Sequence, residues 1–169
     1  ENRPVHFLLS KFCDVSRSIP YILLAMLLMS LSRLIMGTAI GVRGAIIPLL
    51  FGTIPYLGRQ TENALAEVPS GVIEAAQSIG SSPLEIIWRV YLKEAIPGIA
   101  RGVTITLISL INFTAMAGTL GAGGLGNFAY SYGYARNRND VMVVVILIII
   151  VMVSIIQAAG TYIAKKGTH

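Results

Sequence analysis

The sequence predicts an all-α, polytopic transmembrane protein. Hydrophobic residues make up 54% of its 169 residues and charged residues only 12%, whereas a soluble domain carries about 25% charged residues. Residues 102–135 and residues 141–164 contain no Asp, Glu, Lys or Arg. Each run is longer than the roughly 20 apolar residues that a helix needs to cross the hydrocarbon core of a bilayer. A buried strand would end after about 4 to 8 residues, so these runs indicate membrane helices.

We expect residues 1–169 to form a single transmembrane domain with four spans. The predicted spans cover residues 19–36, 38–57, 99–120 and 141–164. The first begins around Pro20, because proline is tolerated in the first turn of a helix. The second contains Pro48 and Pro55, which interrupt helices, so its ends are the least well defined. The last two are long enough, at about 1.5 Å per residue, to cross a core of about 30 Å.

Basic residues in the connections predict the orientation, because cytoplasmic loops of membrane proteins collect Lys and Arg. With the N-terminus inside the cell, nine basic residues fall on the cytoplasmic side: Arg3, Lys11, Arg17, Arg59, Arg89, Lys93, Arg101, Lys165 and Lys166. Four fall on the outer side: Arg33, Arg43, Arg136 and Arg138. This distribution favours both termini in the cytoplasm, and it places the polar stretch 59–97 there as one long loop.

The loop 59–97 is predicted to hold two short helices around a tight turn. Its apolar residues recur at helical spacing in two stripes, Val72, Ile73, Ala76 and Ile79, and then Leu84, Ile87, Trp88 and Tyr91. Gly80 suits the left-handed position that follows a helix. Ser82, Pro83 and Glu85 form the start signal of the second helix, with Ser82 as N-cap and Glu85 closing a capping box.

Several stretches of the chain resemble a known transporter family. Glu74-Ala75-Ala76 followed by Gly80 resembles the EAA loop of the permease subunits of ABC importers. Residues 17–20 (RSIP), 62–87 and 115–134 are similar to the permease of methionine-type ABC transporters. The resemblance implies the ABC type I importer permease fold in a multi-pass protein of the bacterial cytoplasmic (inner) membrane. It also implies transport of methionine, as the D isomer, the L isomer or both.

The resemblance further implies partners. Two copies of the permease form the translocation path as a homodimer, two cytoplasmic ABC ATPase subunits drive it, and an extracytoplasmic methionine-binding (lipo)protein delivers the substrate. No cofactor is implied for the permease itself. The chain lacks a G-x-x-x-x-G-K-[ST] loop, the motif that cradles the phosphates of ATP. We therefore expect a transport subunit and not an enzyme, with ATP hydrolysis in the partner subunit.

The EAA loop is the part that the resemblance assigns to ATPase coupling. The residues expected there are Glu74, Ala75, Ala76, Gly80, Ser82 and Pro83. Small residues allow a close backbone approach, and the Glu74 carboxylate can pair with a basic group of the partner. A simpler interpretation stays open, in which Ala75 and Ala76 are only good helix formers and Gly80 only ends the helix.

The chain departs from the family pattern in two places. The family's loop usually ends in Leu-Pro, but here Leu92 is followed by Lys93, and the next proline is Pro97. We therefore expect the helix break that a proline imposes to shift to Pro97. The family usually has five spans where four are predicted here, and the chain does not open with Met. A missing first helix is the expected explanation.

A glycine-rich stretch lies at the end of the third predicted span. Residues 121–126 (GAGGLG) match the dinucleotide-binding pattern G-x-G-x-x-G, but that pattern acts only between a strand and a helix. Here it follows a membrane helix, so we interpret it as a packing, turn or gate element at the outer end of that span. The glycines expected to serve packing and turning are Gly118, Gly121, Gly123, Gly124 and Gly126.

Polar residues inside spans are candidates for the translocation path, because polar groups in hydrocarbon are costly. Ser109, Asn112 and Thr114 are expected to lie near one another along the third span. Asn112 and Met116 are expected to face the interface between the two permeases, where the flexible thioether of Met116 could close the path or touch substrate. A lipid-facing or packing role for Met116 stays open.

Other functions are alternatives or are disfavoured. A permease of the same superfamily for another amino acid, a phosphonate or a sulfonate stays possible, as does a membrane scaffold without transport. An ion channel would need lining charges or a carbonyl filter, and the sequence shows neither. The 13 basic residues are scattered between apolar runs, so we expect no nucleic-acid partner. His6 and His169 have no ligand neighbours at metal-binding spacing, and Cys13 is the only cysteine.

Overall fold

The computed structural model describes residues 3–167, and every regular element in that range is a helix. The predicted all-α class is therefore confirmed. The elements are α1 (Arg3–Ser18), α2 (Tyr21–Met36), α3 (Gly41–Ala66), α4 (Ser70–Ser78), α5 (Pro83–Glu85), the π-helix η1 (Ile86–Tyr91), α6 (Leu92–Ala117), η2 (Gly118–Ala122), α7 (Gly124–Phe128), η3 (Ala129–Gly133), η4 (Tyr134–Arg136) and α8 (Asn139–Lys166).

The first part of the chain is a bent pair of helices, of which the predicted span 19–36 covers only the second. Helix α1 precedes α2, and the axes of residues 10–18 and 21–36 meet at 105°. The bend lies at Pro20, whose extended backbone (φ −54°, ψ 129°) ends α1, while its carbonyl accepts the first hydrogen bonds of α2 from Leu23 and Leu24. Within the described residues, three continuous helices are long and apolar enough to cross a membrane, and the bent pair makes a fourth candidate.

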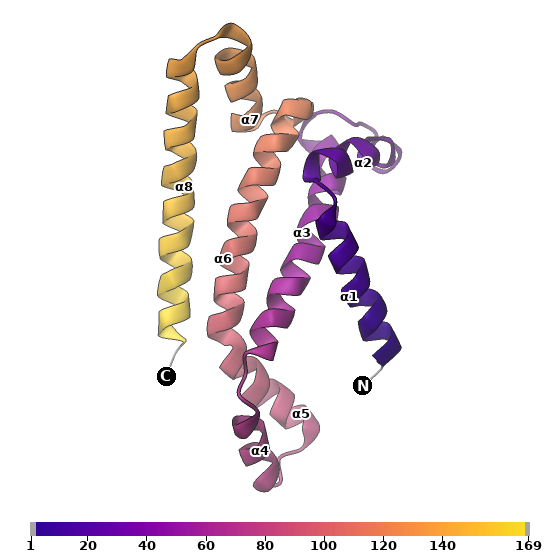
Figure 1. Ribbon diagram of the computed structural model, residues 1–169, viewed down its shortest axis with the longest axis vertical. Coiled ribbons are helices and arrows are strands. Elements are labelled where there is room, and N and C mark those ends of the chain that lie inside the picture. Colours follow the sequence, from indigo (N-terminus) through magenta and orange to yellow (C-terminus); the bar gives the residue numbers. More distant parts are fainter. Residues whose placement is uncertain (1–2, 168–169) are drawn as a thin grey trace.

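Helices α3, α6 and α8 lie side by side as the long helices of the structure (Figure 1). Small residues bring α3 and α6 together, because a Cβ atom at Gly98 would lie 2.9 Å from that of Ala64, and one at Gly102 would lie 3.0 Å from that of Gln60. Close approach through glycine is the usual packing device of membrane helices, where van der Waals contact drives association. Helix α8 leaves apolar side chains such as Ile155 exposed, as a lipid-facing helix does.

Two helix boundaries differ from the predicted ones. Helix α3 continues to Ala66, nine residues beyond the predicted end at 57, and it contains both Pro48 and Pro55. The expected break at Pro97 is wrong, since α6 runs through that proline from Leu92 to Ala117. The irregularity lies earlier, in the π-helical turn η1. A proline removes one backbone hydrogen bond, and close packing of α6 on α3 holds the helix together around it.

Both termini lie toward the end of the molecule where α4 and α5 project (Figure 1). Helices α2 and α7 and the turn before α8 lie at the opposite end. The termini and the α4–α5 hairpin therefore share one side, as the predicted orientation requires.

Candidate coupling hairpin and translocation groove

The segment that resembles the EAA loop forms a projecting hairpin of α4 and α5 (Figure 1). Gly80 makes the turn in the left-handed region, with φ +83°, and a Cβ atom there would meet nothing within 4 Å. The position therefore needs glycine for its backbone conformation and not for space.

The predicted capping box is present at the start of the second helix. The Ser82 backbone N–H and hydroxyl donate to Glu85 Oε2 at 3.0 and 2.9 Å, and the Glu85 N–H donates back to Ser82 Oγ at 3.4 Å. These hydrogen bonds to the carboxylate hold the pKa of Glu85 below its ordinary value, the backbone one most strongly. The hairpin turn is thus fixed by its own backbone and caps before any partner binds.

The side chains of the hairpin divide into an inner and an outer set. Ala76 and Ile86 are buried between the two arms, at 7% and 8% exposed. Ile79 of the first apolar stripe is 83% exposed, and Leu84 and Trp88 of the second are 69% and 70% exposed. These three side chains therefore point outward instead of packing within the chain. Of the residues expected to couple to the ATPase, Ala76 lies inside the hairpin, and the other five are exposed: Glu74, Ala75, Gly80, Ser82 and Pro83.

The glycines near the end of α6 serve two different geometries. Gly118 and Gly126 lie at backbone contacts: a Cβ atom at Gly118 would lie 2.6 Å from the Asn127 nitrogen, and one at Gly126 would overlap the Ala115 carbonyl. Gly121, Gly123 and Gly124 instead have positive φ angles of 94°, 85° and 73°. The chain therefore reverses here and folds α7 back onto the end of α6, with a helix and not a strand before the glycines.

A groove of about 410 Å³ lies where the α1–α2 bend meets α3 and α6. Ser109 and Asn112 both line it. Thr114 does not, because two residues along a helix point to nearly opposite sides, and it lines a second, mostly apolar cavity between α3, α6, α8 and the glycine turn. The expectation that Thr114 lies with Ser109 and Asn112 is therefore wrong. Met116 is 45% exposed at the end of α6.

The groove also contains residues that the sequence did not assign to the translocation path. The Arg17 guanidinium lies over the Tyr56 ring, 5.2 Å from its centroid, and both residues line the groove. Tyr21 stacks on Phe113 at 4.6 Å, and its buried hydroxyl has no hydrogen-bond partner. The available signal was the position of Arg17 three residues before Pro20 and the apolar run that follows it, but the basic-residue count places Arg17 on the cytoplasmic side.

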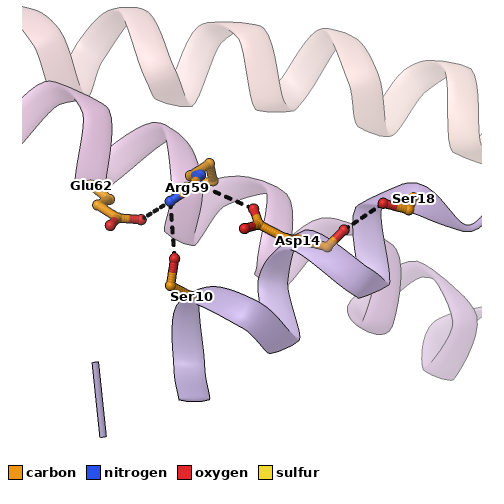
Figure 2. Close-up of polar contacts among 5 residues, drawn as sticks. All are labelled: Ser10, Asp14, Ser18, Arg59 and Glu62. Carbon is orange, nitrogen blue, oxygen red and sulfur yellow. Dashed lines mark hydrogen bonds and ion pairs between the residues drawn. The ribbon is translucent and has the colours of Figure 1, made fainter. Parts of the chain in front are cut away.

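A cluster of polar residues joins α1 to α3 (Figure 2). Arg59 donates to Asp14 at 2.9 Å and to Ser10 at 3.2 Å on α1, and to Glu62 at 2.7 Å on its own helix. Ser18 donates to the Asp14 carbonyl at 2.8 Å. Arg59 thus pairs with carboxylates of two helices, whereas the sequence suggested only a cytoplasmic charge. No group of three His, Cys, Asp or Glu side chains suited to a metal occurs among residues 3–167.

Long apolar helices, a projecting hairpin with an exposed apolar surface and a partly polar groove between the helices are the features of a polytopic membrane protein. The chain belongs to the family of inner membrane components of binding-protein-dependent transport systems, whose pattern matches residues 1–166. It is accordingly a multi-pass protein of the inner membrane.

Individual relatives are similar over the whole chain. The probable D-methionine transport system permease protein MetI of Vibrio cholerae is 44% identical over 169 residues, which are 100% of this chain and 75% of that protein. The protein of the same name from Haemophilus influenzae is also 44% identical, over 100% of this chain and 79% of its own length.

The fold matches a solved transporter. A chain in the inward-facing MetNI methionine ABC transporter (CY5 native crystal form) superposes with a TM-score of 0.93 at 41% identity, covering 99% of this chain and 78% of that one. The SeMet-soaked crystal form gives a TM-score of 0.92. The ABC type I importer permease fold implied by the sequence is therefore confirmed.

Proposed function

We propose that this chain is the permease of a methionine importer that carries D-methionine, L-methionine or both. The observation that carries the proposal is similarity along the entire chain to permeases named for D-methionine transport, at 44% identity. A fold shared with the permease of a methionine ABC transporter supports it. The alternative is a permease for another amino acid, a phosphonate or a sulfonate. Measured uptake of methionine would exclude this alternative.

The working unit that we propose is a permease homodimer with two ABC ATPase subunits and an extracytoplasmic methionine-binding protein. ATP hydrolysis belongs to the ATPase subunits. We propose that residues 1–169 form one transmembrane domain and that the predicted loop 59–97, whose two ends belong to α3 and α6, faces the cytoplasm. The α4–α5 hairpin lies within that loop and extends beyond the long helices (Figure 1).

The hairpin is the element that we propose docks on the ATPase. Ile79, Leu84 and Trp88 expose apolar surface, which contact with a partner would remove from water. Glu74 of α4 is also exposed, and it has no resolved ion pair among residues 3–167. It is therefore available to a basic group of the ATPase.

Within the membrane, we propose that Ser109, Asn112 and Met116 line the translocation path and its gate. Ser109 and Asn112 support this role because they line the groove. Gly118, Gly121, Gly123, Gly124 and Gly126 shape the turn at the outer end of α6. Substitution of Met116 by Ala tests the gate, and unchanged uptake and basal ATPase rate would leave Met116 a packing residue.

Uptake of labelled methionine tests the function. The host is a methionine-requiring bacterial strain without its own high-affinity importer, and it carries the full-length permease gene with its ATPase and binding-protein genes. We expect uptake with wild-type permease and none with Gly80→Asp, although both reach the membrane. Wild-type complex that assembles but takes up no methionine refutes the substrate. Gly80→Asp that assembles and transports normally refutes docking through the hairpin.

A further inference from the structure

Arg17 occupies an unusual position for an unpaired cation. It lies near the end of α1, its guanidinium is over Tyr56 near the middle of the 26-residue α3, and it shares a groove with Ser109 and Asn112 of α6. These helices are membrane-span candidates, except that α1 counts only together with α2. Arg17 is exposed, so a solute in the groove can reach it. A charged residue among membrane-span helices marks a candidate functional site.

The carboxylate closest in sequence does not neutralise Arg17. Asp14, one helical turn earlier, accepts from Arg59 at 2.9 Å instead (Figure 2). Among residues 3–167, the Arg17 guanidinium has the Tyr56 ring as its only resolved partner, and no hydrogen-bond or ion-pair acceptor. A guanidinium that stacks on an aromatic ring makes this contact with its flat face. Its N–H groups lie in the guanidinium plane and stay free to donate to a carboxylate.

A second observation points to a ligand at the same place. Tyr21 also lines the groove, is only 7% exposed, and its hydroxyl has no hydrogen-bond partner. Buried polar groups are almost always satisfied, and an exception calls for a missing partner. Tyr21, whose buried hydroxyl is unsatisfied, and Arg17, whose guanidinium is unpaired, thus both line one groove.

The walls of the groove define the solute that fits. Arg17, Ser109 and Asn112 supply one cation and two neutral hydrogen-bonding groups, whereas Ile19, Leu24 and Phe113 supply apolar surface. The volume of about 410 Å³ falls in the range of small-molecule sites, about 300–1,000 Å³. A small molecule with a carboxylate at one end and an apolar chain at the other matches both kinds of wall.

We infer that Arg17 is a binding residue for the α-carboxylate of the transported amino acid, at a station within the permease itself. Asn112 and Ser109 orient the polar end, and the apolar wall receives the side chain. Tyr56 acts as a positioning residue, because its ring holds the guanidinium toward the groove. This inference rests on the proposed function, since it assigns a substrate-contacting role on the same path.

The first test measures uptake with Arg17→Gln, Arg17→Lys and the control Arg33→Gln in the complete transporter. Arg33 is an exposed arginine of α2 outside the groove. We expect Arg17→Gln to lower uptake by about tenfold or more, which is the effect expected from losing one hydrogen bond to a charged group. Arg17→Lys should retain part of it, because it keeps the charge but loses the bidentate geometry. Arg33→Gln should transport normally.

The second test reads binding directly, without the binding protein. Cys13 is replaced by Ser, and a single cysteine is introduced by Ser16→Cys, at a residue that lines the groove. In the permease–ATPase complex, methionine should slow maleimide labelling of this cysteine, and methioninamide, which has no carboxylate, should not. Adding Arg17→Gln should abolish the protection by methionine.

The outcomes separate the two proposals. No methionine uptake by assembled wild-type transporter refutes the proposed function. Uptake by wild type together with undiminished uptake and undiminished protection in Arg17→Gln refutes the carboxylate site alone. Equal protection by methionine and methioninamide also refutes the carboxylate site, because the groove would then bind the solute without any contribution from its carboxylate.

Discussion

Gly160 of α8 lies directly against Thr104 of α6. A Cβ atom at position 160 would overlap the Thr104 hydroxyl and lie 2.7 Å from its methyl carbon. The hydroxyl itself donates to the Ala100 carbonyl at 2.7 Å, so it is not free to turn aside. This contact fixes how closely the last helix approaches the rest of the bundle.

We expect Gly160→Ala to destabilise the protein by about 1–3 kcal/mol, the usual cost of overpacking a tight contact. Thermal unfolding of the purified protein in detergent measures the loss. Adding Thr104→Ala should restore part of the stability, because it removes two of the overlapping atoms. Gly71→Ala is the matched control, since a Cβ atom there meets nothing within 4 Å. An unchanged melting temperature for Gly160→Ala would contradict the close packing.

The Arg59 cluster should matter more to stability than an exposed ion pair. Arg59 bridges Asp14 and Glu62 with its side chain 27% exposed, whereas Arg138 pairs with Asp140 at 61% and 63% exposed. We expect Arg59→Gln to lower the stability more than Arg138→Gln does, because exposed ion pairs contribute little. Chemical denaturation of both variants measures the difference. Equal losses would show that the cluster does not tie α1 to α3.

Acid should loosen the hairpin through Glu85. The pKa of Glu85 is lowered in the folded protein by hydrogen bonds from Ser82. The resulting stabilisation is therefore fully present above the ordinary glutamate pKa and is lost as the pH falls through the lower folded-state pKa. Trp88 is the only tryptophan of the chain, and its fluorescence reports on this helix. We expect an acidic fluorescence transition in wild type that Glu85→Gln lacks; the same transition in both would assign it elsewhere.

Substitutions at Gly80 should separate backbone strain from side-chain effects. With φ at +83° and open space around the Cβ position, Gly80→Val is strained and Gly80→Asn is tolerated, since asparagine adopts left-handed conformations more readily. We expect Gly80→Asn to assemble with the ATPase far better than Gly80→Val in co-purification. Equal assembly of both variants would show that this turn conformation is not needed for docking.

Features coded within a few neighbouring residues could be predicted from the sequence. The Gly80 turn and the capping box of Ser82 and Glu85 are found where expected, because glycine and capping chemistry act over one helical turn. The apolar runs likewise predicted the long helices α6 and α8. In these segments the helix preference of neighbouring residues and the length of the apolar run, which matches the bilayer thickness, both predict a long helix.

Features that depend on distant partners were missed or misplaced. Helix α1 carries Lys11, Asp14 and Arg17, so it shows no apolar run, and its contact with Arg59 joins positions 45 residues apart. The polar end of α3 was expected to be a loop, but Gln60 and Ala64 pack on glycines of α6. The place of Arg17 in the groove follows from the bend at Pro20, where the sequence predicted the start of a helix but not the angle of 105°.

From Pro83 to Leu120 the backbone stays helical through α5, η1, α6 and the start of η2, and Gly121 is the first residue with a non-helical conformation. The exposed side chains of Leu84 and Trp88 lie near one end, and Ser109 and Asn112 lie well along toward the other. Hydrogen bonds along a helix resist bending. If the hairpin docks on the ATPase as proposed, we expect a displacement of the hairpin to move Ser109 and Asn112 through the backbone of this stretch, which includes the π-helix η1 and Pro97.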